Sequence, residues 1–245
     1  MSNSGEVQSV DRAVTVLEIL ADRGEAGVTE LAAELGVHKS TASRLVGALV
    51  QRGLVEQNGE RGRYRLGLGM VRLAGAAASR IDLPQVAQPI CEMLAGELGE
   101  TVNVAVLDDR HAVNVCQGLS QAAIGSFNWV GRRTPLHATS SGKVLLAFCA
   151  DRPRDLTLAK FTGRTVTDAG RLAEQLDEIR ARGWGTTSEE LEIGLNAVAA
   201  PVLGTRAAIS ASGPSFRLTT DKFPAYGQRL VSGAAQISAS LGVIA

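Results

Sequence analysis

The amino-acid sequence predicts an α/β chain of two domains: an N-terminal winged helix-turn-helix and a C-terminal α+β domain. In the first part, three short helical patterns separated by glycines are followed by an Asn-Gly turn between two strand-like runs. In the second, β-branched runs alternate with amphipathic helical patterns. We place the first domain at 1–66, a linker helix at 67–82 and the second domain at 83–245.

Composition excludes several classes of protein. The chain has 245 residues, 25 basic and 25 acidic side chains, and 45% hydrophobic residues. No apolar run reaches the ~18–20 residues of a membrane helix, and the N-terminus lacks a secretory signal. The three cysteines are odd in number and widely spaced, so they indicate neither a disulfide framework nor a metal-binding pair. We therefore expect a cytoplasmic protein with no membrane contact, no metal and no cofactor.

Three helices are expected in the first domain. Ser9 can cap a helix that runs to about Arg23, and Thr29 can cap a short second helix that ends at Gly36. The third helix should run from about Lys39 to Arg52. The residues expected on the buried face of the first helix are Val10, Ala13, Val14, Leu17 and Leu20.

The third helix presents a small, polar and basic surface. With Val37, Ala42 and Leu45 facing inward, the outward residues are His38, Lys39, Ser40, Thr41, Ser43, Arg44 and Gly47. Hydroxyls and cations near a helix N-terminus suit entry into the major groove of double-stranded DNA. These outward side chains, without Gly47, are our candidate DNA-binding residues on the helix.

A basic β-hairpin should follow as the wing. Arg61, Arg63 and Arg65 alternate along its second strand, so their side chains share one face. Residues 38–65 carry six basic and two acidic side chains, which suits contact with phosphates. Arg61 and Arg63 complete the candidate DNA-binding residues. Mixed charges could instead solvate a small domain, and a winged helix could mediate protein contacts.

The rest of the chain predicts an antiparallel sheet with helices on its faces. Helices are expected at 66–80, 83–98, around Leu172–Ile179 with an end near Gly183, and at 219–241; one more is capped by Ser140 or Ser141 and runs to Cys149. Strands are expected at 101–107, 112–117, 124–130, 184–187, 197–203 and 207–212.

One group of residues could bind a small carboxylate. Ser140 and Ser141 lie at a helix start, where free N–H groups and the helix dipole favour an anion. Ser210 and Ser212 alternate on a strand and share a face. A second alternating set, Leu195, Ala197 and Ala199, could supply small apolar walls. The same residues could also be ordinary caps and core positions.

Two other functions are conceivable for this part of the chain. A hydrolase would use His137 with Ser140 or Ser141, but no Gly-x-Ser-x-Gly nucleophile elbow is present. We therefore do not expect an enzyme, and a small-molecule hydrolase fused to a DNA reader stays the alternative. A purely structural adaptor would bind no small molecule at all.

Several segments together resemble one known family. VQSVDRAVTVLEIL resembles the opening helix of the IclR family of bacterial transcription regulators, and TELAAELGVHKSTASRLVGALVQRGLVEQ with GRYRLG resembles its winged helix-turn-helix. PLHATSSGKVLLA (135–147), GWGTTSEELEIGLNAVAAPV (183–202) and ISASGP (209–214) resemble its effector-domain motifs. The match covers nearly the whole chain in the family's order.

The resemblance implies a ligand-responsive regulator, more often a repressor, that binds pseudo-palindromic operators. It implies a GAF-like or profilin-like effector domain, homodimers or homotetramers, and a small organic or aromatic acid as effector. The positions that match the family's effector-contacting motifs are Ser140, Ser141, Thr187, Leu195, Ala197, Ala199, Ser210 and Ser212. His38 replaces a common proline, and residues 113–117 lack the aromatic and acidic residues often found there.

Overall fold

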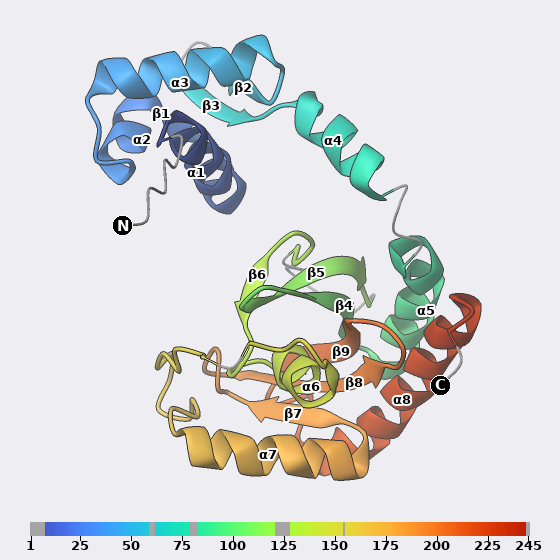
Figure 1. The fold of residues 1–245 in the computed structure, drawn as a ribbon. Helices are drawn as coiled ribbons and strands as arrows, with labels where there is room; N and C mark the ends of the chain where they lie inside the picture. The colour runs from blue at the N-terminus through green and yellow to red at the C-terminus, as the bar shows by residue number, and fades with distance from the viewer. Residues whose placement is uncertain (1–7, 59–61, 79–82, 121–127, 154, 244–245) are drawn as a thin grey trace. The chain divides into compact units, whose positions relative to one another are not determined.

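The computed structural model describes residues 8–58, 62–78, 83–120, 128–153 and 155–243. They form two compact units, one within residues 1–81 and one within residues 82–245 (Figure 1). In these described ranges, no helix has both the length and the apolar character needed to cross a bilayer.

The N-terminal unit is a helix-turn-helix with a small sheet. Its elements are α1 (Gln8–Arg23), β1 (Ala26–Gly27), α2 (Val28–Glu34), α3 (Lys39–Gln51), β2 (Val55–Asn58), β3 (Arg63–Leu66) and α4 (Leu68–Ala78). The strands are antiparallel in the order β1-β3-β2. The two-residue strand β1 was not expected from the sequence. It makes β3 the central strand of the wing.

The expected buried face of α1 is confirmed at Leu20, with Ala13 and Leu17 packed against the same core, and is wrong at Val10 and Val14. Val16 and Leu20 are its buried residues, whereas Val10 and Val14 are 59% and 48% exposed. The α3 helix and β3 pack against the side of α1 that carries Val16. The sequence of α1 alone does not show which of its valines lie on that side. The expected caps Ser9 and Thr29 also lie inside helices: α1 already includes Gln8, and Gly27 caps α2 with its N–H donating to the Glu30 carboxylate at 2.9 Å.

The turn between α2 and α3 follows the sequence prediction. Gly36 has φ +61°, a left-handed conformation that side chains disfavour, and the Val37 N–H donates to the Ala32 carbonyl at 3.0 Å. Ala32 and Ala42 are buried, which lets the two helices approach closely. Gly53, at φ +69°, ends α3 and leads into the wing.

The C-terminal unit contains a six-stranded antiparallel sheet. Its elements are α5 (Leu83–Leu98), β4 (Thr101–Asp108), β5 (His111–Gly118), β6 (Arg133–Pro135), α6 (Ser140–Phe148), α7 (Ala169–Arg182), β7 (Gly185–Ser188), β8 (Leu195–Val202), β9 (Ala207–Pro214), the 3₁₀ helix η1 (Thr220–Lys222) and α8 (Phe223–Ser240). The strand order is β6-β5-β4-β9-β8-β7.

Each face of this sheet has its own core. The α5 and α8 helices pack together on one face around Cys91, Val104 and Leu230. The α6 helix covers the other face around Leu136 and Val144, with α7 packed outside it (Figure 1). The N-terminus of α6 therefore lies against the sheet.

An irregularity in β5 changes which residues face α6. The β4–β5 register shifts between Val104 and Ala105, so that Val104 pairs with Cys116 and Ala105 pairs with Asn114. An extra residue in a strand reverses the side-chain alternation beyond it. Cys116 consequently packs toward α5, while Asn114 turns to the opposite face.

Two expectations in this unit need correction. Thr139, not Ser140 or Ser141, caps α6: its Oγ1 accepts from the Gly142 N–H at 3.2 Å. The strand expected at 124–130 falls mostly outside the described residues, and its described part, 128–130, is not a strand. The strand beside β5, at this edge of the sheet, is instead β6, whose three residues are too few to leave a sequence pattern.

Candidate functional site

The outward face of α3 is open to solvent. Of its predicted DNA-contacting side chains, Lys39, Ser40, Ser43 and Arg44 are exposed and Thr41 is half-buried. In the described part of the chain, neither Lys39 nor Arg44 makes an ion pair. Both cations can therefore contact DNA without first losing a protein partner.

His38 is exposed and caps α3. Its Nδ1 lies 2.9 Å from Ser40 Oγ and 3.4 Å from the Ser40 amide nitrogen. The backbone carbonyl of His38 accepts from Thr41 and Ala42. Helix N-caps are usually small side chains such as Ser, Thr, Asp or Asn, but here an imidazole caps α3 at the end that would meet DNA.

The wing arginines are held by carboxylates of their own unit. Arg63 contacts Glu25 at 2.7 Å and Glu30 at 3.2 Å. Arg65 contacts Glu56, its partner across the β2–β3 ladder, at 2.7 Å. Arg61 lies outside the described residues. On the evidence of these pairs, Arg63 must exchange partners before it can contact a phosphate.

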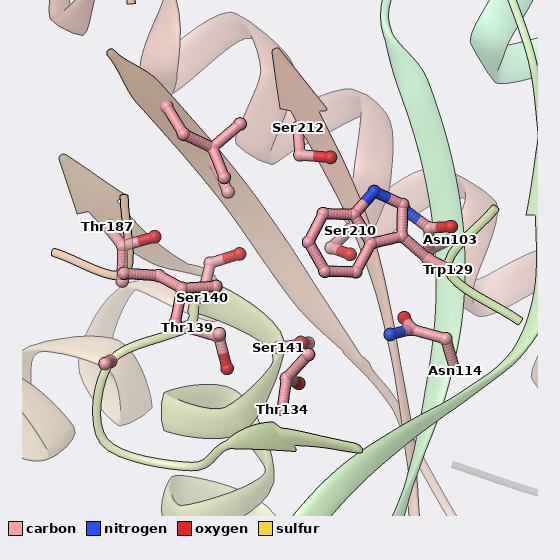
Figure 2. A pocket seen from close by; sticks show the side chains of 14 residues that line it. Asn103, Asn114, Trp129, Thr134, Thr139, Ser140, Ser141, Thr187, Ser210 and Ser212 are labelled. Carbon is pink, nitrogen blue, oxygen red and sulfur yellow. The ribbon is translucent and has the colours of Figure 1, made fainter. Parts of the chain in front are cut away.

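A pocket opens in the C-terminal unit between α6, the sheet and the segment that follows β7 (Figure 2). The empty space within its lining amounts to about 490 Å³ when the part open to solvent is included. Its lining consists of nine neutral polar and five apolar residues: Asn103, Asn114, Thr134, Thr139, Ser140, Ser141, Thr187, Ser210 and Ser212, with Trp129, Ala138, Leu191, Leu195 and Ala197.

Seven of the eight predicted effector residues meet in this pocket. Ser140 and Ser141 come from the first turn of α6, and Ser210 and Ser212 from β9. Thr187 from β7 pairs with Ala197 of β8, and both line the same wall as Leu195. The exception is Ala199, which is fully buried in the core beneath α6 and is not among the described lining residues.

The position of Ser140 and Ser141 depends on a close approach at Gly142. A Cβ at Gly142 would lie 2.4 Å from the Leu136 carbonyl oxygen, so only glycine permits this contact. With Thr139 capping the helix, the first turn of α6 lies against the segment before it. The N-terminal end of a helix carries partial positive charge, which favours an anion there.

Three lining residues at the opposite end of the pocket were not predicted from the sequence. Figure 2 shows Asn103, Asn114 and Trp129 on the side away from Thr187. Asn103 is 4% exposed, and its Oδ1 accepts no hydrogen bond from any described residue. A buried acceptor without a donor costs stability unless a ligand supplies one. Strand alternation could have indicated Asn103, but Asn114 reaches this side only through the bulge.

No described lining residue of the pocket carries a charge. A buried ion pair lies behind the lining: Lys143, fully buried on α6, contacts the Glu190 carboxylate at 2.6 and 2.7 Å and Gln175 at 2.8 Å. Burial lowers the pKa of Lys143, while the charge of Glu190 opposes that shift. The pair joins α6 to the segment that bears Leu191, one wall of the pocket.

That wall segment is fastened by hydroxyls as well. Thr162 Oγ1 donates to the Glu189 carbonyl at 2.7 Å, and Thr165 Oγ1 donates to the Glu190 carbonyl at 2.6 Å. The Glu189 carboxylate accepts from the Gly194 N–H and from Ser215 Oγ. The wall therefore has a defined position before any ligand binds.

The hydrolase alternative finds no support. His137 Nε2 lies 2.9 Å from the Ala159 carbonyl oxygen, and the imidazole packs against Phe161 with ring centroids 5.8 Å apart. His137 is 3% exposed. Its ring is thus a core element bonded to backbone, not a base beside Ser140 or Ser141.

A helix-turn-helix with an exposed polar helix, joined in one chain to a domain with a small-molecule pocket, defines the class of ligand-binding transcription regulators. The family model "IclR helix-turn-helix domain" matches residues 9–59, and the model "Bacterial transcriptional regulator IclR C-terminal" matches residues 75–239. The chain belongs to the IclR family of bacterial transcriptional regulators.

Known relatives match nearly the whole of its length. The transcriptional repressor IclR of Escherichia coli is 32% identical over 98% of this chain and 92% of its own length. The regulator BhcR of Paracoccus denitrificans is 31% identical over 96% and 88%. The crystal structure of an IclR homologue from Microbacterium hydrocarbonoxydans, complexed with 4-hydroxybenzoate, has a TM-score of 0.81 at 26% identity and covers 96% of this chain and 99% of that one.

Proposed function

We propose that this protein is a repressor that binds a pseudo-palindromic operator as a homo-oligomer and responds to a small organic or aromatic acid. The observation that carries the proposal is a pocket with donor groups and no charge, in the same chain as an exposed, unpaired basic helix. Repression is supported by the relative named as a repressor. Operator binding would take place in the cytoplasm.

The operator is contacted by α3 in the major groove. Arg44, Lys39 and the three hydroxyls of Ser40, Thr41 and Ser43 meet base edges and phosphates, and His38 lies at the helix start. Arg61 and Arg63 hold the wing on the backbone. Because Arg63 is already paired with two glutamates, its net contribution is smaller than that of Arg44.

The effector places its carboxylate at the N-terminus of α6, near the hydroxyls of Ser140 and Ser141. Ser210 and Ser212 of β9 face it from the sheet, with Ser210 beside its cross-strand partner Asn103. Leu195 and Ala197 contact its apolar part, with Thr187 beside them, and Ala199 supports this wall from the core. A hydroxyl at the far end would donate to Asn103 Oδ1. The bound 4-hydroxybenzoate of the homologue has both groups.

Assembly would begin at the linker. The segment 67–82 contains α4, whose Leu68, Val71 and Leu73 are 76%, 66% and 58% exposed. Exposed apolar side chains on a short helix are expected to pack against a second copy of the chain. Paired linkers would set the spacing of two DNA-binding units, and effector binding would change that spacing.

The test begins with selection of bound sequences from a random duplex library by the full-length protein. We expect a pseudo-palindromic site whose affinity falls steeply with salt. A thermal-shift series with small aliphatic and aromatic acids, 4-hydroxybenzoate included, then identifies compounds that raise the melting midpoint. A stabilising acid that leaves operator affinity unchanged would contradict the proposal, as would failure to select any duplex.

A further inference from the structure

Two of the three cysteines lie side by side in the C-terminal unit. Cys91 of α5 and Cys116 of β5 are both buried, and their Sγ atoms are 3.6 Å apart. Cys116 also donates to Gln88 Oε1 at 3.1 Å. A disulfide needs an S–S distance of about 2.05 Å, so the sulfurs must approach each other by roughly 1.5 Å.

The backbones are already close at this point. Gly118 lies on the same face of β5 as Cys116, and a Cβ there would be 2.3 Å from the Cys91 carbonyl oxygen. The glycine thus lets α5 contact the strand directly beside the two thiols. We expect rotation of the two side chains to close the remaining gap.

The two thiols are not equivalent. The hydrogen bond between the two sulfurs lowers the pKa of Cys116. The same hydrogen bond, together with burial, raises the pKa of Cys91. Cys116 also lines a cavity of about 850 Å³, part of it open to solvent, together with Gln88 and Gln117. A small oxidant can therefore reach the more acidic thiol of the pair.

We propose that Cys91 and Cys116 form an oxidisable dithiol, a modification site at which a hydroperoxide converts the two thiols into a disulfide between α5 and β5. The Cys116 thiolate attacks one peroxide oxygen, the O–O bond breaks, and water or an alcohol leaves. The Cys91 sulfur then displaces water from the resulting sulfenic acid as the S–S bond forms. Two electrons pass from the thiols to the peroxide.

The disulfide would act on the effector pocket through β5. Cys116 is two residues from Asn114, which lines the pocket on the other side of the bulge. A bond to α5 fixes this strand where the bulge would otherwise let it adjust. Oxidation and effector binding would thus influence the same strand.

The third cysteine provides a matched control. Cys149 lies at the C-terminal end of α6 in the other core, and in the described part of the chain no second thiol is within hydrogen-bond distance of it. Burial raises the pKa of Cys149. Hydrogen peroxide should therefore oxidise Cys149 about tenfold more slowly than the Cys91–Cys116 pair.

The experiment treats the reduced full-length protein with hydrogen peroxide, blocks remaining thiols with N-ethylmaleimide and maps tryptic peptides by mass. We expect a cross-link between the peptides 81–110 and 111–132 that dithiothreitol reverses. Cys149→Ser should keep the cross-link, and Cys91→Ser should instead let dimedone label Cys116. Oxidation of Cys149 at the same rate, or a pair that stays reduced when Cys149 reacts, would overturn the proposal.

Discussion

Replacing Lys143 by methionine tests whether the buried pair behind the pocket holds the effector domain together. Lys143 is fully buried, and Glu190, its partner at 2.6 Å, is 8% exposed at the side chain. Methionine has a similar shape but leaves the Glu190 carboxylate buried without its cation. Removing one partner of a buried ion pair costs about 3–5 kcal/mol.

This cost predicts a measurable fall in the melting temperature. For a unit of the size of residues 82–245, each kcal/mol corresponds to roughly 2–4 °C, so the midpoint should fall by about 6–20 °C. Both tryptophans of the chain, Trp129 and Trp184, lie in this unit. Tryptophan fluorescence therefore follows its unfolding without interference from the N-terminal unit.

A double variant separates lost pairing from lost packing. Lys143→Met with Glu190→Met leaves no buried charge and should recover most of the loss, because two apolar side chains replace a pair whose desolvation was costly. A Lys143→Met variant that melts within ~2 °C of wild type, or a double variant that melts lower than the single one, would show that the buried pair does not hold the domain together.

Three further predictions concern the proposed interfaces. Arg44→Ala should weaken operator binding by ~1–3 kcal/mol in gel-shift titrations at fixed salt, whereas the same change at exposed Arg110 of the other unit should have no effect. Ser140→Leu should abolish the effector response and spare DNA binding. A response at wild-type effector concentrations would show that the effector does not bind against Ser140. Asn103→Leu should weaken binding of 4-hydroxybenzoate by ~1–3 kcal/mol while leaving benzoate unaffected, as calorimetry would measure; equal losses for both acids would disprove the acceptor role of Asn103.

Features that depend only on residues close together in the sequence could be predicted from it. Gly36 and Gly53 mark the ends of helices because the chain needs positive φ there, and both angles are positive in the structure. The alternation of Ser210 and Ser212 is a local property of an extended strand, so their shared face could be predicted. The helix beginning at Ser140 was likewise predicted, although Thr139 supplies the cap.

Other features were decided by which elements meet. The bulge in β5, opposite Val104 and Ala105 of β4, directs Asn114 into the pocket. It depends on the pairing of the two strands and cannot be read from the β5 sequence alone. Arg63 finds Glu25 and Glu30 only after β1 and α2 pack beside β3.

Local spacing in this sequence, with the family resemblance for Thr187, predicted the helices, the turns and seven of the fourteen described residues that line the pocket. Side-chain direction and ion pairing were set by contacts between segments far apart in the chain. Lys143 and Glu190 are 47 residues apart, and no local pattern relates them. Only the tertiary structure brings such groups together, because a buried charge must find its partner wherever the packed core places it.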